Sequence, residues 1–202
     1  MILLCRHIRR ARALSGVLRH EIISCEASLI QSKEHYGRSG MYGDKIDSKD
    51  KLAMELCEAL DMCAENSYPV IDLTDQKVSI VFDSAYVDPD VNEGLHGHEV
   101  VDVDPVDSHE GFRIMENFAM SRSDEQARRL ARALSMKHPF KRFRMALAGI
   151  GITDEWYAYK AEEYLWLAKE RLEWSSVDFV DGRIVCGDRK KIRTYLCECV
   201  DD

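Results

Sequence analysis

SYPVIDLTDQKVSIVFD, residues 67–83, is the stretch that decides the fold. It contains two β-rich runs, residues 68–73 and 77–82, on either side of the polar turn Thr74-Asp75-Gln76. Branched and aromatic side chains favour strands because they pack well on a pleated surface. The pattern therefore predicts an antiparallel β-hairpin.

Strand signals continue after this hairpin. Residues 99–103 hold three valines flanked by acidic residues and predict a third strand. Near the C-terminus, VDFVDGRIVCGD (residues 177–188) alternates apolar residues around Asp181-Gly182, a dipeptide that favours a two-residue hairpin turn. We therefore expect a small antiparallel sheet and a second hairpin in the tail.

Helix signals dominate from Asp107 onward. Asp107 and Glu110 have the spacing of a capping box, and Ser123 and Gln126 repeat it. Gly149 would end the helix that follows Pro139. Five helices are predicted after residue 47, and each begins with a residue that favours a helix N-terminus: Ser48, Asp107, Ser123, Pro139 and Thr153. The predicted fold class is α+β, mainly helical, with helices packed on a small antiparallel hairpin sheet.

The first 47 residues are predicted to form a separate region. Apolar residues recur every three or four positions over residues 4–29, which indicates an amphipathic helix. Gly37, Gly40 and Gly43 then indicate a flexible connector. The arginine-rich, acid-poor start also fits an organellar presequence. We expect this appendage over residues 1–47 and a main α+β domain over residues 48–202, ending in the hairpin tail.

Composition and charge narrow the class of protein. Apolar residues make up 46% of the chain and charged residues 32%, as in globular proteins. The formal net charge of −8 should repel nucleic acid and anionic membranes on average, although a local basic surface can still bind phosphate. The seven cysteines form no CxxC pair and favour free thiols in a reducing compartment. We expect a cytoplasmic protein with no membrane partner.

Three helical segments carry a resemblance to a known family: HEGFRIMENFA (109–119), KHPFKRFRMAL (137–147) and DEWYAYKAEEYLWLAKERLEW (154–174). Over about residues 52–179 they resemble the bacterial uncharacterised protein family UPF zero-one-five-eight. The matching positions are Met115, Glu116, Phe118, Phe140, Lys141, Arg142, Phe143, Trp156, Tyr157, Tyr159, Leu172 and Trp174. The resemblance implies the fold and a bacterial source, and it adds no reaction.

Charge is segregated along the chain. Residues 78–112 contain no lysine or arginine and many acidic residues, whereas residues 126–153 contain seven basic residues and no acidic one. The residues expected to bind nucleic acid or an acidic partner are Arg128, Arg132, Lys141, Arg142 and Arg144. Alternatively, these cations form a solvated face, or one that docks on the chain's own acidic segment. Phe140 and Phe143 are expected to be buried in the core.

A metal site is a further hypothesis. His96 and His98 stand one residue apart in the acidic stretch, and on a strand both imidazoles would share one face. With Asp102 as a third ligand they could hold a divalent metal that activates water for hydrolysis. A solvated acidic loop is the alternative. No other cofactor is expected.

The last predicted helix carries aromatic residues on more than one face. Such a helix is either deeply buried or covers a partner, and Trp166 is a candidate interface residue.

Three functions therefore stay open. The first is a non-enzymatic interaction or regulatory protein that acts through its acidic and basic faces, with an unidentified protein or another copy of the chain as partner. The second is a nucleic-acid-associated protein, and the third is a metal-dependent hydrolase. The chain has no glycine-rich phosphate loop, GxSxG or HExxH motif, which favours the non-enzymatic hypothesis.

Overall fold

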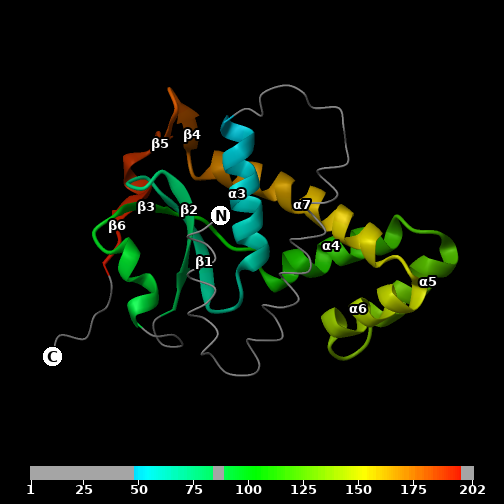
Figure 1. The fold of residues 1–202 in the computed structure, drawn as a ribbon. Helices are drawn as coiled ribbons and strands as arrows, with labels where there is room; N and C mark the ends of the chain where they lie inside the picture. Colours follow the sequence, from blue (N-terminus) through cyan, green and yellow to red (C-terminus); the bar gives the residue numbers. More distant parts are fainter. Residues whose placement is uncertain (1–47, 84–88, 197–202) are drawn as a thin grey trace. The chain divides into compact units, whose positions relative to one another are not determined.

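A computed structural model describes residues 48–83 and 89–196, which all belong to one unit of the chain, Met41–Asp202 (Figure 1). The predicted N-terminal helix and connector, residues 1–47, lie outside the described residues. None of the described helices is both long enough and apolar enough to cross a bilayer.

The predicted hairpin is confirmed. Strand β1 (Ser67–Asp72) pairs antiparallel with β2 (Lys77–Phe82), and Ser67 faces Phe82 in the register. The predicted third strand is also present as β3 (Glu99–Asp102), which pairs with the other side of β1. A fourth strand, β6 (Ile192–Thr194), pairs with β3 and completes the sheet order β2-β1-β3-β6. It was not predicted, because three residues with one apolar side chain carry no strand signal.

The described residues form five α-helices, and the α+β fold class is confirmed. They are α3 (Ser48–Met62), α4 (Ser108–Met120), α5 (Asp124–Leu134), α6 (Pro139–Ile150) and α7 (Thr153–Trp174). The short 3-10 helices η2 (Pro89–Leu95) and η3 (Arg189–Lys191) lie in the connections between these elements.

The helix caps agree only in part with the sequence prediction. Asp107 and Glu110 form the expected capping box, and the N–H of Glu110 that Asp107 accepts lowers the pKa of Asp107. Ser123 precedes α5, but its hydroxyl donates to the Gln126 side chain and caps no backbone N–H. Thr153 is the first residue of α7 rather than its cap, and α6 ends at Ile150 with Gly151 as its C-cap, rather than stopping at Gly149. Gly151 has φ of 81°, a conformation that glycine adopts without strain.

The tail hairpin is confirmed as β4 (Val177–Val180) and β5 (Arg183–Cys186). Its turn residues Asp181 and Gly182 have φ of 50° and 81°, as the predicted turn type requires. The hairpin does not end the domain, because the chain continues through η3 and returns to the main sheet as β6.

Two hydrophobic clusters meet along α7. The first joins α3, one face of the sheet and the β4-β5 hairpin to the C-terminal half of α7, where Ala168 and Leu172 are buried. The second joins α4, α5 and α6 to the N-terminal half of α7 through Phe118, Phe143 and Trp156. Those three rings pack edge to face, with centroids 5.0 to 6.3 Å apart. Figure 1 shows α7 passing from the strands to the α4-α6 region.

A buried ion pair links the two halves. Arg171 of α7 is only 5% exposed, and its Nη2 donates to both carboxylate oxygens of Glu110 at 2.8 Å. Its Nε donates to the carbonyl of Asp104, and the guanidinium lies 4.9 Å from the Trp174 ring centroid. Because Glu110 also belongs to the α4 capping box, one arginine fixes the start of α4 against α7.

Arg171→Ala should lower the free energy of unfolding by about 3 kcal/mol or more, because it leaves the Glu110 carboxylate without its partner in a largely buried place. Urea denaturation of the full chain measures the change. The matched control is Lys169→Ala, whose exposed pair with Asp50 should contribute less than about 1 kcal/mol. Equal effects of the two substitutions would contradict this role of Arg171.

Candidate functional site

Helices α5 and α6 direct their basic side chains away from the core. Leu130 of α5 and Phe143 of α6 are fully buried. Arg128 and Arg132 lie two residues from Leu130, and Lys141 lies two residues from Phe143, which places each about 200° around its helix. The burial of one side thus forces these cations onto the opposite, solvated side.

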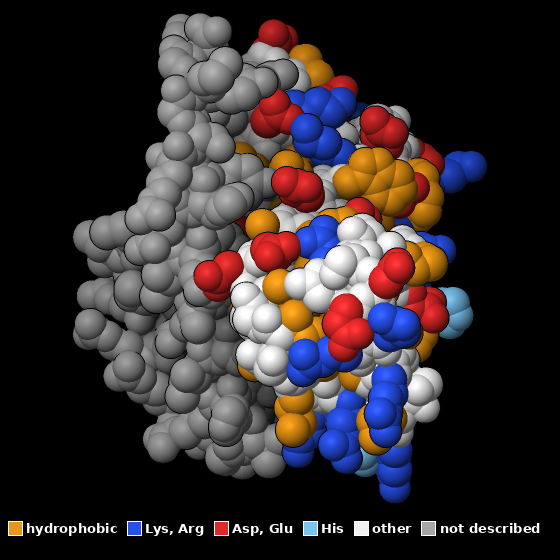
Figure 2. All heavy atoms as spheres, turned by 90° about the vertical axis from the view of Figure 1, so that its right-hand side faces the viewer, with side chains coloured by type: hydrophobic (Ala, Val, Ile, Leu, Met, Phe, Trp, Pro, Cys, Tyr) orange, Lys and Arg blue, Asp and Glu red, His pale blue; other side chains and the backbone are white. Residues whose placement is uncertain are grey.

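The basic side chains of this pair of helices form one surface. We call it the basic surface, and its residues are Arg128, Arg132, Lys137, Lys141, Arg142 and Arg144, all exposed. Apart from the Arg128–Glu125 contact at 3.2 Å between two well exposed side chains, none of them forms an ion pair with a residue that the structure describes. Figure 2 shows lysine and arginine side chains gathered at the lower end of the view, with no acidic side chain visible among them.

Apolar side chains are interleaved with these cations. Met145 is 58% exposed and Phe140 is 42% exposed. The prediction that Phe143 is buried is confirmed, whereas burial of Phe140 is wrong, because its ring lies over Gly111 at the edge of the α4 contact and stays half open to solvent. The surface therefore offers apolar contact as well as charge.

The acidic stretch does not pair with the basic surface within the part of the chain that the structure describes. Asp102 accepts two hydrogen bonds of 2.6 Å from Arg193 of β6, and Glu110 pairs with Arg171. No ion pair between described residues joins residues 89–112 to residues 128–144. The segregation visible in the sequence therefore persists in the fold.

The predicted metal trio is not brought together. His96 and Gly97 form a turn, with Gly97 at φ of 79°, and β3 begins only at Glu99. The two imidazoles therefore do not share a strand face, which was the premise of the prediction. Asp102 is held by Arg193 on β6, and His98 contacts Asp72 instead.

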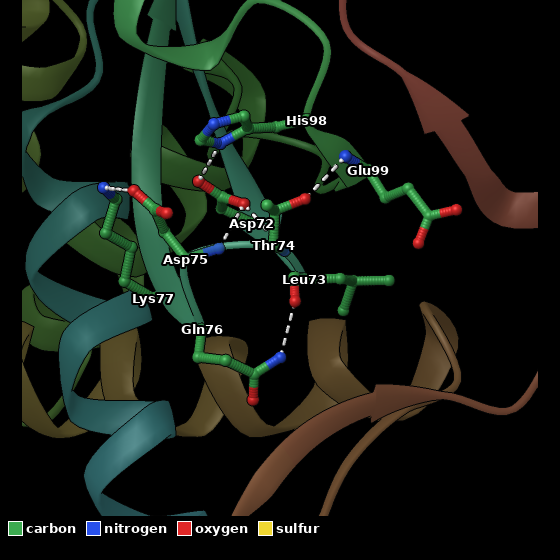
Figure 3. A network of polar contacts seen from close by, with 8 residues as sticks. All are labelled: Asp72, Leu73, Thr74, Asp75, Gln76, Lys77, His98 and Glu99. Carbon is green, nitrogen blue, oxygen red and sulfur yellow. Dashed lines mark hydrogen bonds and ion pairs between the residues drawn. The ribbon is translucent and has the colours of Figure 1, made fainter.

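A different cluster forms at the turn of the β1-β2 hairpin (Figure 3). Asp72, at the end of β1, is completely buried, and its Oδ1 accepts the N–H groups of Thr74 and Asp75 at 2.9 Å each. Its Oδ2 lies 2.9 Å from Nδ1 of His98. Asp75 is paired with Lys77 at 2.6 Å, and that contact lowers the pKa of Asp75.

Asp72, Asp75 and His98 are the one set of three potential ligands, among residues 48–83 and 89–196, whose ligand atoms lie within 4.8 Å of one another. Two carboxylates and an imidazole are a donor set that suits a divalent metal. However, both oxygens of Asp72 already hold the turn and the imidazole, and Asp75 already holds Lys77. The geometry is that of a turn lock, in which a buried carboxylate organises the hairpin and attaches the segment before β3.

The sequence contained a partial signal for this cluster. In turns, an aspartate side chain commonly accepts the backbone N–H groups of the residues two and three positions later. Asp72 could therefore have been assigned to the turn. Its contact with His98, 26 residues away, depends on the β1-β3 pairing and has no local signal.

Two of the described thiols, Cys57 and Cys63, offer no nucleophile at neutral pH. Cys57, Cys63 and Cys186 are free and half-buried. Burial raises the pKa of Cys57 and of Cys63 to about 12, so both stay protonated thiols.

Asp72→Ala should lower the free energy of unfolding by about 2 kcal/mol or more, because it leaves two turn N–H groups and His98 without their buried acceptor. Asp72→Asn should lower the free energy of unfolding by less, because the amide oxygen can still accept the turn N–H groups. Asp75→Ala is the control, since the carboxylate of Asp75 is exposed and its removal should change the free energy of unfolding little.

Denaturation curves of the three variants test this order. A rise in the wild-type Tm on adding Zn²⁺ or Mn²⁺ that His98→Ala removes would contradict the turn-lock interpretation and support a metal site instead.

Comparison with known proteins does not assign the chain to a family. No protein-family model, curated protein or solved structure matches the chain significantly. The resemblance of about residues 52–179 to the family UPF zero-one-five-eight therefore stays a prediction from the sequence, and the functional evidence is the chain's own surfaces.

Proposed function

We propose that the chain is a non-enzymatic interaction protein of the bacterial cytoplasm whose basic surface binds an acidic segment of a protein partner. The observation that supports this proposal is the set of exposed cations on α5 and α6, of which only Arg128 forms an ion pair with a residue that the structure describes. A surface with this many cations on a chain of net charge −8 concentrates positive potential in one place, which favours an acidic partner.

The apolar residues on this surface favour a protein over nucleic acid. Protein interfaces are enriched in methionine, aromatic residues and arginine, which are the residues interleaved here: Phe140, Met145 and the arginines of α5 and α6. Nucleic-acid surfaces rely mainly on phosphate contacts, which the overall negative charge of the chain opposes at long range. The exposed acids Asp124 and Glu125 in the first turn of α5 would also repel a phosphate backbone.

The size of the effects indicates what kind of segment can bind. An exposed ion pair contributes roughly 0.2–1 kcal/mol and is weakened by salt, so charge alone gives little affinity. Burial of apolar surface adds about 25 cal/mol per Å². A partner segment should therefore carry several acidic residues together with large apolar ones, so that Phe140 and Met145 are covered.

The test is binding of a fluorescent synthetic peptide rich in Glu, Leu and Trp to the full chain at low and high salt, beside generic duplex DNA and single-stranded RNA. The peptide should bind at low salt and weaken as salt rises. Arg132→Glu with Arg144→Glu should weaken it at least about tenfold, because attraction becomes repulsion at two exposed positions.

The matched control is Arg183→Glu with Lys190→Glu, which makes the same charge change on β5 and η3 and should leave peptide binding nearly unaltered. Equal weakening by both pairs would show that only net charge matters. Tighter binding to DNA or RNA than to the peptide would overturn the proposal in favour of a nucleic-acid-associated protein.

A further inference from the structure

Helix α7 carries a surface of opposite charge along its full length. One side of the helix shows residues spaced by four, three, four, four and three positions, which is the spacing of a single helical face. We call it the acidic stripe, and its residues are Glu155, Tyr159, Glu162, Trp166, Glu170 and Glu173. At 1.5 Å per residue it extends for about 27 Å. Four of these residues are exposed, whereas Tyr159 and Glu170 are half-buried, and the exposed Lys169, which pairs with Asp50, lies on the same side.

The stripe has acidic residues without an ion pair in the described chain and an aromatic ring that is exposed to solvent. Trp166 is 59% exposed, although the core holds three other aromatic rings of this region. Glu162 and Glu173 are exposed and form no ion pair with a described residue, whereas Glu155 and Glu170 are paired with neighbouring arginines. A large apolar ring between unpaired carboxylates is typical of an interaction surface.

The acidic stripe has the chemistry that the basic surface requires of a partner. It presents several carboxylates on one helical face with a large apolar ring between them, and the basic surface presents several cations around Phe140 and Met145. Trp166 can pack on the thioether of Met145 and on a nearby guanidinium, both favourable contacts for an indole ring.

The two surfaces do not satisfy each other inside one molecule. Both are exposed in the same structure, and no ion pair between described residues links the stripe to the basic surface. A contact between them must therefore join two molecules.

We propose that the partner of the basic surface is the acidic stripe of a second copy of this chain, an inference that rests on the proposed function. Since two different surfaces meet, the contact is head-to-tail, and in a pair one copy keeps its acidic stripe free while the other keeps its basic surface free. Copies therefore add to one another in open chains or in closed rings, of which the smallest is a pair that makes the contact twice. The net charge of −8 on each copy opposes association at long range, so the contact needs the local complementarity and the burial of Trp166 together.

Sedimentation velocity of the full chain, over a range of protein concentrations at low salt, tests the proposal through a charge exchange. Glu162→Lys with Glu173→Lys makes the stripe basic, and Arg132→Glu with Arg144→Glu makes the basic surface acidic. Each double variant alone should be monomeric, because its two surfaces then have charge of the same sign. An equimolar mixture should associate again, because each variant now offers what the other lacks.

Trp166→Ala should weaken self-association of the wild-type chain by at least about tenfold, while the circular dichroism spectrum stays unchanged because the ring is exposed. Trp174→Ala is a control of equal size, since Trp174 is 57% exposed and lies outside the stripe.

A wild-type chain that stays monomeric at every concentration, or a mixture of the two double variants that does not associate, would overturn the inference. Binding of the synthetic acidic peptide to the monomer would in that case leave the proposed function standing with another partner. Loss of both peptide binding and self-association would remove the proposed function as well.

Discussion

Helix α7 has to be apolar on more than one side, and the rest of the domain is arranged around that constraint. Its first half supplies Trp156 to the cluster built by α4, α5 and α6, and its second half supplies Ala168 and Leu172 to the cluster built by α3 and the sheet. The two clusters approach α7 from different directions, so one narrow apolar face could not serve both. The Arg171–Glu110 pair lies where they meet, and it binds the start of α4 to α7 inside the protein.

The same constraint explains why charge is sorted on the surface. With two sides of α7 buried, its remaining side is narrow, and it carries the acidic stripe around Trp166. In α5 and α6 the burial of Leu130 and Phe143 turns Arg132 and Lys141 outward. Asp102 of β3 and Glu110 of α4 are held by Arg193 and Arg171, and neither pairs with these outward cations.

Local sequence patterns predicted local structure well, but they did not predict contacts between residues that are distant in the sequence. The 67–83 hairpin and the Asp107 capping box depend on neighbours within a few residues, so the sequence revealed both. The Asp72–His98 contact joins residues 26 apart through the β1-β3 pairing, and β6 is held by that sheet rather than by its own three residues. The predicted trio His96, His98 and Asp102 is not brought together for a local reason, because strand alternation was assumed where Gly97 makes a turn. Charge segregation was visible in the sequence, but whether the two stretches meet depended on the partners of Asp102 and Glu110.

The central question is whether the basic surface is free to bind another molecule. Zero-length carbodiimide cross-linking tests this most directly, on a mixture of unlabelled and ¹⁵N-labelled full chains at low salt. The reaction joins a lysine amine only to a carboxylate in direct contact, and mixed-isotope products identify links between two molecules. The structure predicts mixed-isotope links from Lys141 or Lys137 to Glu162 or Glu173. Links from those lysines to the acidic stretch of residues 83–110 within one chain would contradict the account, because the basic surface would then be neutralised by its own fold.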